Sequence, residues 1–136
     1  MVPKVFADTN IIIDFIEQRA FDIANVNRLF ESAENNEITI LISESVMTNA
    51  LYVTALNTQI VQLLNIVSVL CIDEDSFKNA MNSSFRDKED GILYYGALKG
   101  KADYFVTRNK KDFHNYSLKQ LPVITPKELT ARLGLQ

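Results

Sequence analysis

The sequence predicts an α/β fold with three α/β/α layers, in which helices cover both faces of a parallel five-stranded sheet. Two observations support this prediction. Short, nearly continuous apolar runs, typical of buried parallel strands, alternate along the chain with longer amphipathic segments, typical of helices. The chain has 136 residues, 47% of them hydrophobic, with only four glycines and three prolines, which suits one compact domain over residues 1–136.

The first half of the chain is expected to hold two strands and three helices. The run Lys4–Ala7 predicts a strand, and a helix is expected to begin near Ile11. Apolar residues recur at helical spacing over Asp22–Asn35, which predicts an amphipathic helix. The apolar run Thr39–Ile42 predicts the second strand, and helical periodicity resumes over Ser43–Ala55.

The second half repeats the alternation. Val67–Cys71 predicts the third strand, in which the single cysteine is expected to be a small core residue. Helical patterns follow over Asp75–Ser83 and Lys88–Lys99, and Tyr104–Thr107 predicts the fourth strand. Alternation of this kind favours parallel strands joined by helices.

The end of the chain has the best-marked helix. After a fifth strand over Pro122–Ile124, Thr125 is an N-cap residue, Pro126 suits the first helical position and Glu128 completes a capping box. Gly134 is the expected stop.

Charge is unevenly distributed along the chain. The formal net charge is −3, but residues 1–75 hold 3 basic and 11 acidic side chains, and residues 76–136 hold 11 basic and 6 acidic ones. Charge alone leaves open whether the basic residues bind a polyanion or form solvated helix faces. The chain lacks a run of eighteen apolar residues and a secretory pattern at its start, so we expect a cytoplasmic protein without a membrane segment.

Three polar clusters carry the chemical signal. Asp8 directly follows the first strand, Asn109 follows the fourth with Asp112 close behind, and Asp87 and Asp90 lie at the start of a helix. Residues just past the carboxyl ends of parallel strands converge at one edge of the sheet. Oxygen-only ligands are those that Mg²⁺ and Mn²⁺ favour. The clusters therefore predict metal-assisted phosphate chemistry.

A structural interpretation competes with the functional one at each of these positions. Asp, Ser and Thr are preferred helix caps, and for Ser43, Asp73 and Thr125 a cap is the favoured interpretation. Asp8 is either a cap or a ligand. Asp14 lies either on an exposed helix face or behind the site, and the sequence leaves both open.

Asp87 and Asp90, three residues apart, share one helix face. Their carboxylates either face a cation or simply favour the positive end of the helix dipole.

Together these motifs resemble those of PIN domains, and most closely the branch of VapC-type toxin ribonucleases; the resemblance runs from Val5 to Leu129. It implies four acidic side chains that bind Mg²⁺ or Mn²⁺, cleavage of RNA, and a small antitoxin protein as partner. Asp8 matches the first acid and Asp90 the third. The second and fourth positions hold Asn49 and Asn109 instead.

The resemblance assigns catalytic roles to Asp8, Asp90, Asn49 and Asn109. Amide oxygens can ligate Mg²⁺ but add no charge, and the carboxylates of Asp87 and Asp112 would make up part of the deficit. Phosphates flanking the cut would be bound by Arg108, Lys110 and Lys111, with Thr107 beside them or orienting a ligand.

Other functional classes fit less well. A response-regulator receiver needs an acidic pair after the first strand, and a haloacid-dehalogenase-like phosphatase needs a second Asp where Asn10 stands. The serious rival is a PIN-like module with a weakened site that binds RNA or a protein without cutting. A homodimer is also open at this stage.

Overall fold

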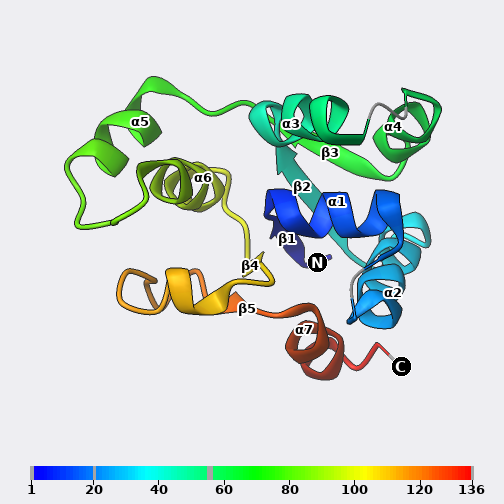
Figure 1. Ribbon diagram of the computed structural model, residues 1–136. Helices are drawn as coiled ribbons and strands as arrows, with labels where there is room; N and C mark the ends of the chain where they lie inside the picture. Colours follow the sequence, from blue (N-terminus) through cyan, green and yellow to red (C-terminus); the bar gives the residue numbers. More distant parts are fainter. Residues whose placement is uncertain (1, 20, 55–56, 136) are drawn as a thin grey trace.

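The structure, a computed structural model, describes residues 2–19, 21–54 and 57–135. Its centre is a five-stranded parallel sheet with the order β3-β2-β1-β4-β5. The strands are β1 (Lys4–Ala7), β2 (Thr39–Ser43), β3 (Val67–Leu70), β4 (Tyr104–Val106) and β5 (Val123–Ile124). This confirms the predicted α/β fold with helices flanking a parallel sheet (Figure 1).

Helices cover both sides of the sheet. They are α1 (Thr9–Glu17), α2 (Ile23–Glu34), α3 (Glu44–Thr54), α4 (Asn57–Leu64), α5 (Glu74–Met81), α6 (Lys88–Lys99) and α7 (Pro126–Leu133), with a short 3-10 helix η1 (Lys110–Asp112). Helix α1 packs on α2 and α3, and α7 packs on α2, whereas α5 and α6 pack on each other. Figure 1 shows these two groups on opposite sides of β1 and β2. None of the helices in the described ranges is long and apolar enough to cross a bilayer.

The register of the central strands determines what meets at the edge of the sheet. Ala7 of β1 pairs with Val106 of β4, and the amide of Asp8 donates to the carbonyl of Val106 at 3.0 Å. The chain therefore leaves β1 and β4 at the same level. Asp8 and Thr107, 99 residues apart in sequence, are consequently neighbours.

Most element bounds agree with the predictions within two residues, and the caps are as expected. Asp73 accepts from the Ser76 amide at 3.0 Å, the Val46 amide donates to Ser43 Oγ at 3.1 Å, and Thr125 forms the predicted capping box. Gly134 ends α7 with a φ of 68°, the left-handed conformation that favours glycine.

One helix in the middle of the chain was not expected, and one expectation there was wrong. Helix α4 lies between the predicted helix that ends at Ala55 and the predicted strand that begins at Val67, a segment for which no element was predicted. Cys71 is exposed rather than in the core, since β3 ends at Leu70 and is an edge strand. The predicted end of the preceding helix, at Ala55, lies outside the described residues.

An aromatic cluster anchors the segment after β4. Phe105 of β4 packs on Phe113 with ring centroids 4.8 Å apart, and Phe85 packs on the same ring at 5.9 Å. Tyr94 of α6 is fully buried, and its hydroxyl donates to the carbonyl of Leu121 at 2.7 Å and accepts from the amide of Leu118 at 2.7 Å. Helix α6 is thereby tied to the segment that leads into β5.

We expect Tyr94→Phe to lower the free energy of unfolding by about 1–3 kcal/mol, because two backbone groups lose their hydrogen-bond partner while the ring is kept. Urea unfolding of the purified protein measures this. Tyr52→Phe, at a tyrosine that is 86% exposed on α3, is the matched control and should change little. An equal effect of the two substitutions would contradict the structural role of the Tyr94 hydroxyl.

Candidate metal centre

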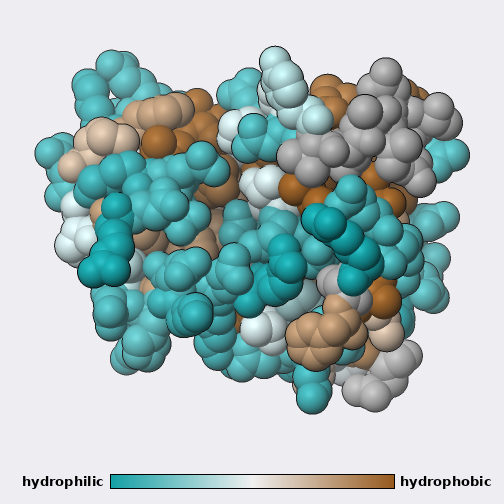
Figure 2. Space-filling model, in the orientation of Figure 1, coloured by the Kyte–Doolittle hydropathy of each residue, from teal (hydrophilic) through white to brown (hydrophobic). Residues whose placement is uncertain are grey.

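The polar clusters meet in a hollow at the carboxyl edge of the sheet. It has a volume of about 320 Å³ and lies where β1, the start of α6 and the segment after β4 come together. Its lining includes Asp8, Thr9, Asn10, Arg19, Asp87, Glu89, Asp90, Arg108, Asn109 and Asp112. Figure 2 shows hydrophilic side chains over the region between α1 and α6, on the face seen in Figure 1.

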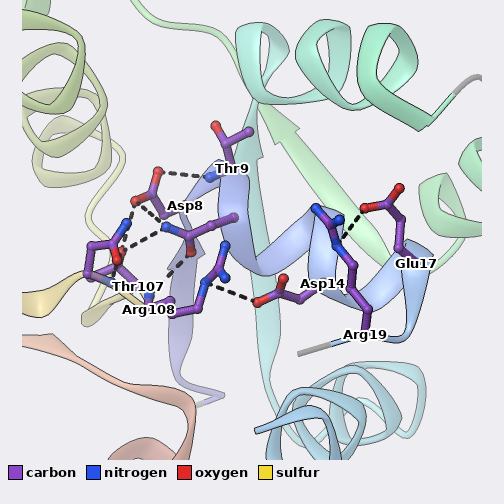
Figure 3. A network of polar contacts seen from close by, with 9 residues as sticks. Asp8, Thr9, Asp14, Glu17, Arg19, Thr107 and Arg108 are labelled. Carbon is purple, nitrogen blue, oxygen red and sulfur yellow. Dashed lines mark hydrogen bonds and ion pairs between the residues drawn. The ribbon is translucent and has the colours of Figure 1, made fainter. Parts of the chain in front are cut away.

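Asp8 is the most buried carboxylate of the hollow, with 7% of its surface exposed. Its Oδ1 accepts from the amide of Thr9 at 2.8 Å, and its Oδ2 accepts from Thr107 Oγ1 at 2.9 Å (Figure 3). Asp8 is also the N-cap of α1, so the cap interpretation of this residue is confirmed, and its place in the hollow leaves it free to be a ligand as well. Burial raises the pKa of Asp8, the hydrogen bonds from Thr107 and Thr9 oppose that rise, and nearby acidic side chains add to it.

Thr107 is fully buried and contacts Asp8. Its Oγ1 donates to Asp8 and accepts from the amide of Asn109 at 3.1 Å. Asn10 completes the network, because its Oδ1 accepts from the amide of Arg108 at 3.2 Å. One hydroxyl thus couples the ends of β1 and β4. Of the two roles predicted for Thr107, these hydrogen bonds favour the one in which it orients a ligand.

We expect Thr107→Val to weaken metal binding about 10- to 100-fold and to lower the free energy of unfolding by about 1–3 kcal/mol. The valine keeps the shape, but leaves the buried Asp8 carboxylate without its hydroxyl donor. Calorimetric titration with Mn²⁺ and urea unfolding measure the two effects. Thr107→Ser retains the hydroxyl and should restore both values; failure of serine to do so would assign the loss to packing.

Asp90 and Asp87 come from the first turn of α6. Asp87 is the N-cap and accepts from the amides of Glu89 at 2.9 Å and Asp90 at 3.4 Å. Burial, and then the charges of Asp87, Asp8, Asp112 and Glu89, raise the pKa of Asp90 to about 7. The carboxylates of the hollow therefore repel one another in the absence of a cation.

Two of the three remaining predicted ligands line the hollow, and one does not. Asn109 and Asp112 both line the hollow, and both are exposed. Asn49 is exposed on α3 and is not among the residues that line it. The hollow therefore brings together Asp8, Asp90, Asp87, Asn109 and Asp112, whereas Asn49 stays outside.

The three basic residues predicted to bind phosphate differ in what they contact. Arg108 lines the hollow, and Lys111 lines an adjoining cavity of about 390 Å³ together with Arg86 and Asp90. Lys110 instead points to α7, where its Nζ lies 2.9 Å from the carboxylate of Glu128. Arg108 and Lys111 are thus near the carboxylates, and Lys110 is held in an ion pair.

One residue that lines the hollow was missed by the sequence predictions, and another residue near it had been left open. Arg19 lines the hollow and pairs with Glu17 at 2.9 Å, but no pattern in the sequence indicates that a side chain from beyond α1 reaches it. Asp14 is buried, with Arg108 Nε 3.4 Å from its Oδ2 (Figure 3). Asp14 is therefore not on an exposed face of the helix, which was one of the two placements left open.

The residues of the hollow fit a hard divalent cation. All the candidate donors are carboxylate or amide oxygens, and Thr9 Oγ1 is a further oxygen, buried with no hydrogen-bond partner among the described residues. In the described part of the chain, no three acidic, histidine or cysteine side chains form a group compact enough to enclose a metal. That is compatible with Mg²⁺, which keeps several waters and uses one or two carboxylates plus substrate phosphate.

The raised pKa of Asp90 predicts how stability depends on pH. Between pH 4 and about 7 the folded state holds a proton that the unfolded state has released, so the metal-free protein should lose stability as pH rises through this window. Urea unfolding at pH 5 and pH 8 measures the slope. Saturating Mn²⁺ or the substitution Asp90→Asn should reduce this dependence of stability on pH. Glu31→Gln, at an exposed carboxylate on α2, is the control and should leave it unchanged. An unchanged slope in Asp90→Asn would contradict the assignment.

The comparisons with known proteins agree with this geometry. Residues 4–111 match the PIN domain family, so the chain belongs to that family. No curated protein matches the chain closely in sequence.

Solved structures of toxin–antitoxin proteins share the fold. VapBC2 of Rickettsia felis, bound to a DNA fragment from its promoter, has 19% identity and a TM-score of 0.64, covering 90% of this chain and 98% of that one. A toxin–antitoxin complex from Klebsiella pneumoniae has 20% identity and a TM-score of 0.66, covering 90% and 97%. VapC20 of Mycobacterium tuberculosis, described as a toxin that cleaves the sarcin–ricin loop, has 13% identity and a TM-score of 0.64, covering 85% and 97%.

Proposed function

We propose that this PIN domain is a divalent-metal-dependent ribonuclease that hydrolyses phosphodiester bonds of RNA in the cytoplasm. One observation carries the proposal: Asp8 and Asp90, from distant parts of the sequence, line one hollow in which the repulsion between carboxylates helps to raise the pKa of Asp90 to about 7. Carboxylates kept together against this repulsion are costly unless a cation is bound.

Each side chain has a separate task in this mechanism. Asp8, held by Thr107 and the Thr9 amide, and Asp90 would bind Mg²⁺ or Mn²⁺, with the oxygen of Asn109 beside them. The ion, when bound, supplies water of lowered pKa and neutralises charge that builds on the phosphate. Arg108 is half-exposed at the hollow and would bind a flanking phosphate.

The basic side chains near Asp90 extend this surface. Lys111 and Arg86 line the cavity that adjoins the hollow, next to Asp87 and Asp90. They would bind phosphates further along the strand, by the charge attraction that is independent of sequence.

The structural relatives support a role as the toxin of a toxin–antitoxin pair, with a small antitoxin protein as partner. Two of them are toxin–antitoxin complexes, and a third is described as a toxin that cleaves the sarcin–ricin loop. A binding module without cleavage is the second candidate. The neutral Asn109 at a position where the family pattern has an acid favours it.

Cleavage of a fluorescent single-stranded RNA with Mn²⁺, and with EDTA as the metal-free control, tests the proposal. We expect products with Mn²⁺ and none with EDTA. If the protein binds the RNA but cuts it at no Mn²⁺ concentration, the binding module is the correct function.

A further inference from the structure

A second cavity lies beside the hollow, between α1, α2 and the start of α7. It has a volume of about 260 Å³ and its walls are largely apolar, formed by Ile11, Val26 and Pro126 among others. Asp14, Phe21 and Arg108 also line it. This is smaller than sites for drug-sized ligands, which measure roughly 300–1,000 Å³, and suits one flat ring system.

Asp14 gives the cavity an unused hydrogen-bond acceptor. The residue is 1% exposed, and its Oδ2 faces Arg108 Nε at 3.4 Å. Its other oxygen, Oδ1, is buried and has no hydrogen-bond partner within the described residues. Buried acceptors are nearly always satisfied, by protein or by ordered water, so this oxygen needs a donor that the described side chains do not supply, and an N–H group of a bound ring is one that fits the cavity.

Phe21 gives the cavity a free aromatic surface. Its side chain is 99% exposed, although phenylalanine is among the residues most often buried. A free ring at the edge of a narrow apolar cavity is suited to stacking against another flat ring, as aromatic side chains do with bases of single-stranded RNA.

Arg108 joins this cavity to the hollow, because it lines both. A strand with a phosphate at the hollow would therefore have a base within reach of the cavity. Because Asp14 Oδ1 is an acceptor, a base that binds beside it must present N–H donors. Because the Arg108 guanidinium is a donor, the same base must present an acceptor toward Arg108. Guanine has both on adjacent atoms, with N1–H and the 2-amino group as donors and O6 as acceptor.

We propose that this cavity is a subsite for a guanine base of the RNA, stacked on Phe21, with Asp14 Oδ1 accepting from its N–H groups and Arg108 donating to O6. The strand that supplies the base is the substrate of the proposed function, on which this inference rests. The subsite would make binding and cutting depend on a guanine near the scissile phosphate.

Anisotropy titrations of the full chain with fluorescein-labelled RNAs of sequence UUU-X-UUU test the subsite, with EDTA present so that nothing is cut. X is guanine or hypoxanthine, which lacks only the 2-amino group. We expect guanine to bind about tenfold more tightly. Asp14→Asn should remove this preference for guanine. Phe21→Ala should lower the affinity for both RNAs about tenfold and leave the preference for guanine unchanged.

Matched controls lie on α5, away from the cavity. Phe77→Ala removes another exposed phenylalanine and Asp75→Asn another carboxylate, and neither should change either affinity. Because Phe21 is exposed, its alanine variant should fold even if Asp14→Asn does not; a thermal melt of each variant checks this.

Equal affinity for the two RNAs, or a preference that persists in folded Asp14→Asn, would overturn the subsite. Unchanged RNA affinity in Phe21→Ala would also overturn it. Cleavage with Mn²⁺ separates the two proposals. If the protein cuts both RNAs equally, the guanine subsite is wrong and the nuclease function stands. If it prefers guanine but never cuts, the nuclease function is wrong and the subsite stands.

Discussion

Asp90→Asn should reduce RNA cleavage at least 100-fold while making the metal-free protein more stable at pH 8. Cleavage falls because a charged ligand is replaced by a neutral amide. Stability rises because the asparagine neither repels Asp8 and Asp112 nor carries the charge that burial disfavours. This gain should exceed the loss of a favourable charge at the start of α6, which is about 0.3–1 kcal/mol.

Opposite changes in activity and stability distinguish loss of a ligand from loss of folding. Rates with saturating Mn²⁺ and thermal melts in EDTA measure the two quantities. Asp75→Asn is the matched control, since Asp75 lies in the first turn of α5 but pairs with Lys99. It should leave cleavage unchanged. If Asp90→Asn retains cleavage, Asp90 is not a ligand, and if it melts lower in EDTA, the repulsion inferred for the hollow is absent.

Asn109→Asp should tighten Mn²⁺ binding by roughly tenfold or more. Asn109 lines the hollow, and a carboxylate there adds a full charge next to the ion, where one unit of charge contributes well over the 1.4 kcal/mol that a factor of ten requires. Cleavage at low Mn²⁺ should rise in parallel. The metal-free variant should be less stable at pH 8, because it adds to the repulsion.

Asn49→Glu provides the comparison, because the family pattern has acids at both positions but only Asn109 lines the hollow. We expect the glutamate on α3 to change Mn²⁺ affinity much less than Asn109→Asp does. Calorimetric titration of both variants decides this. A larger effect at Asn49 would mean that α3 contributes to the site and that the lining of the hollow is incomplete.

The sequence predicted the edge of the sheet well because strand ends are local features. Asp8 follows a strand of four residues, three of them apolar, and Thr107 follows another short apolar strand, so their meeting required only that the two strands be parallel. Helix α6 matched its predicted bounds, since Asp87 is a local capping signal.

What the sequence left open depends on packing between distant elements. Asp14 lies on α1, which packs on both α2 and α3, so no exposed face of this helix could be identified from its apolar pattern. Lys110 reaches Glu128, 18 residues further along, and local sequence does not say which partner a long side chain selects. The placement of Asn49 likewise depends on how α3 lies over the sheet.

The central claim is that Asp8 and Asp90 bind the same divalent ion, and calorimetric titration with Mn²⁺ at pH 7 tests it most directly. We expect one site in the parent protein, proton release on binding because Asp90 titrates at about 7, and loss of the site in both Asp8→Asn and Asp90→Asn. Either no binding by the parent, or binding that survives both substitutions, would contradict the claim.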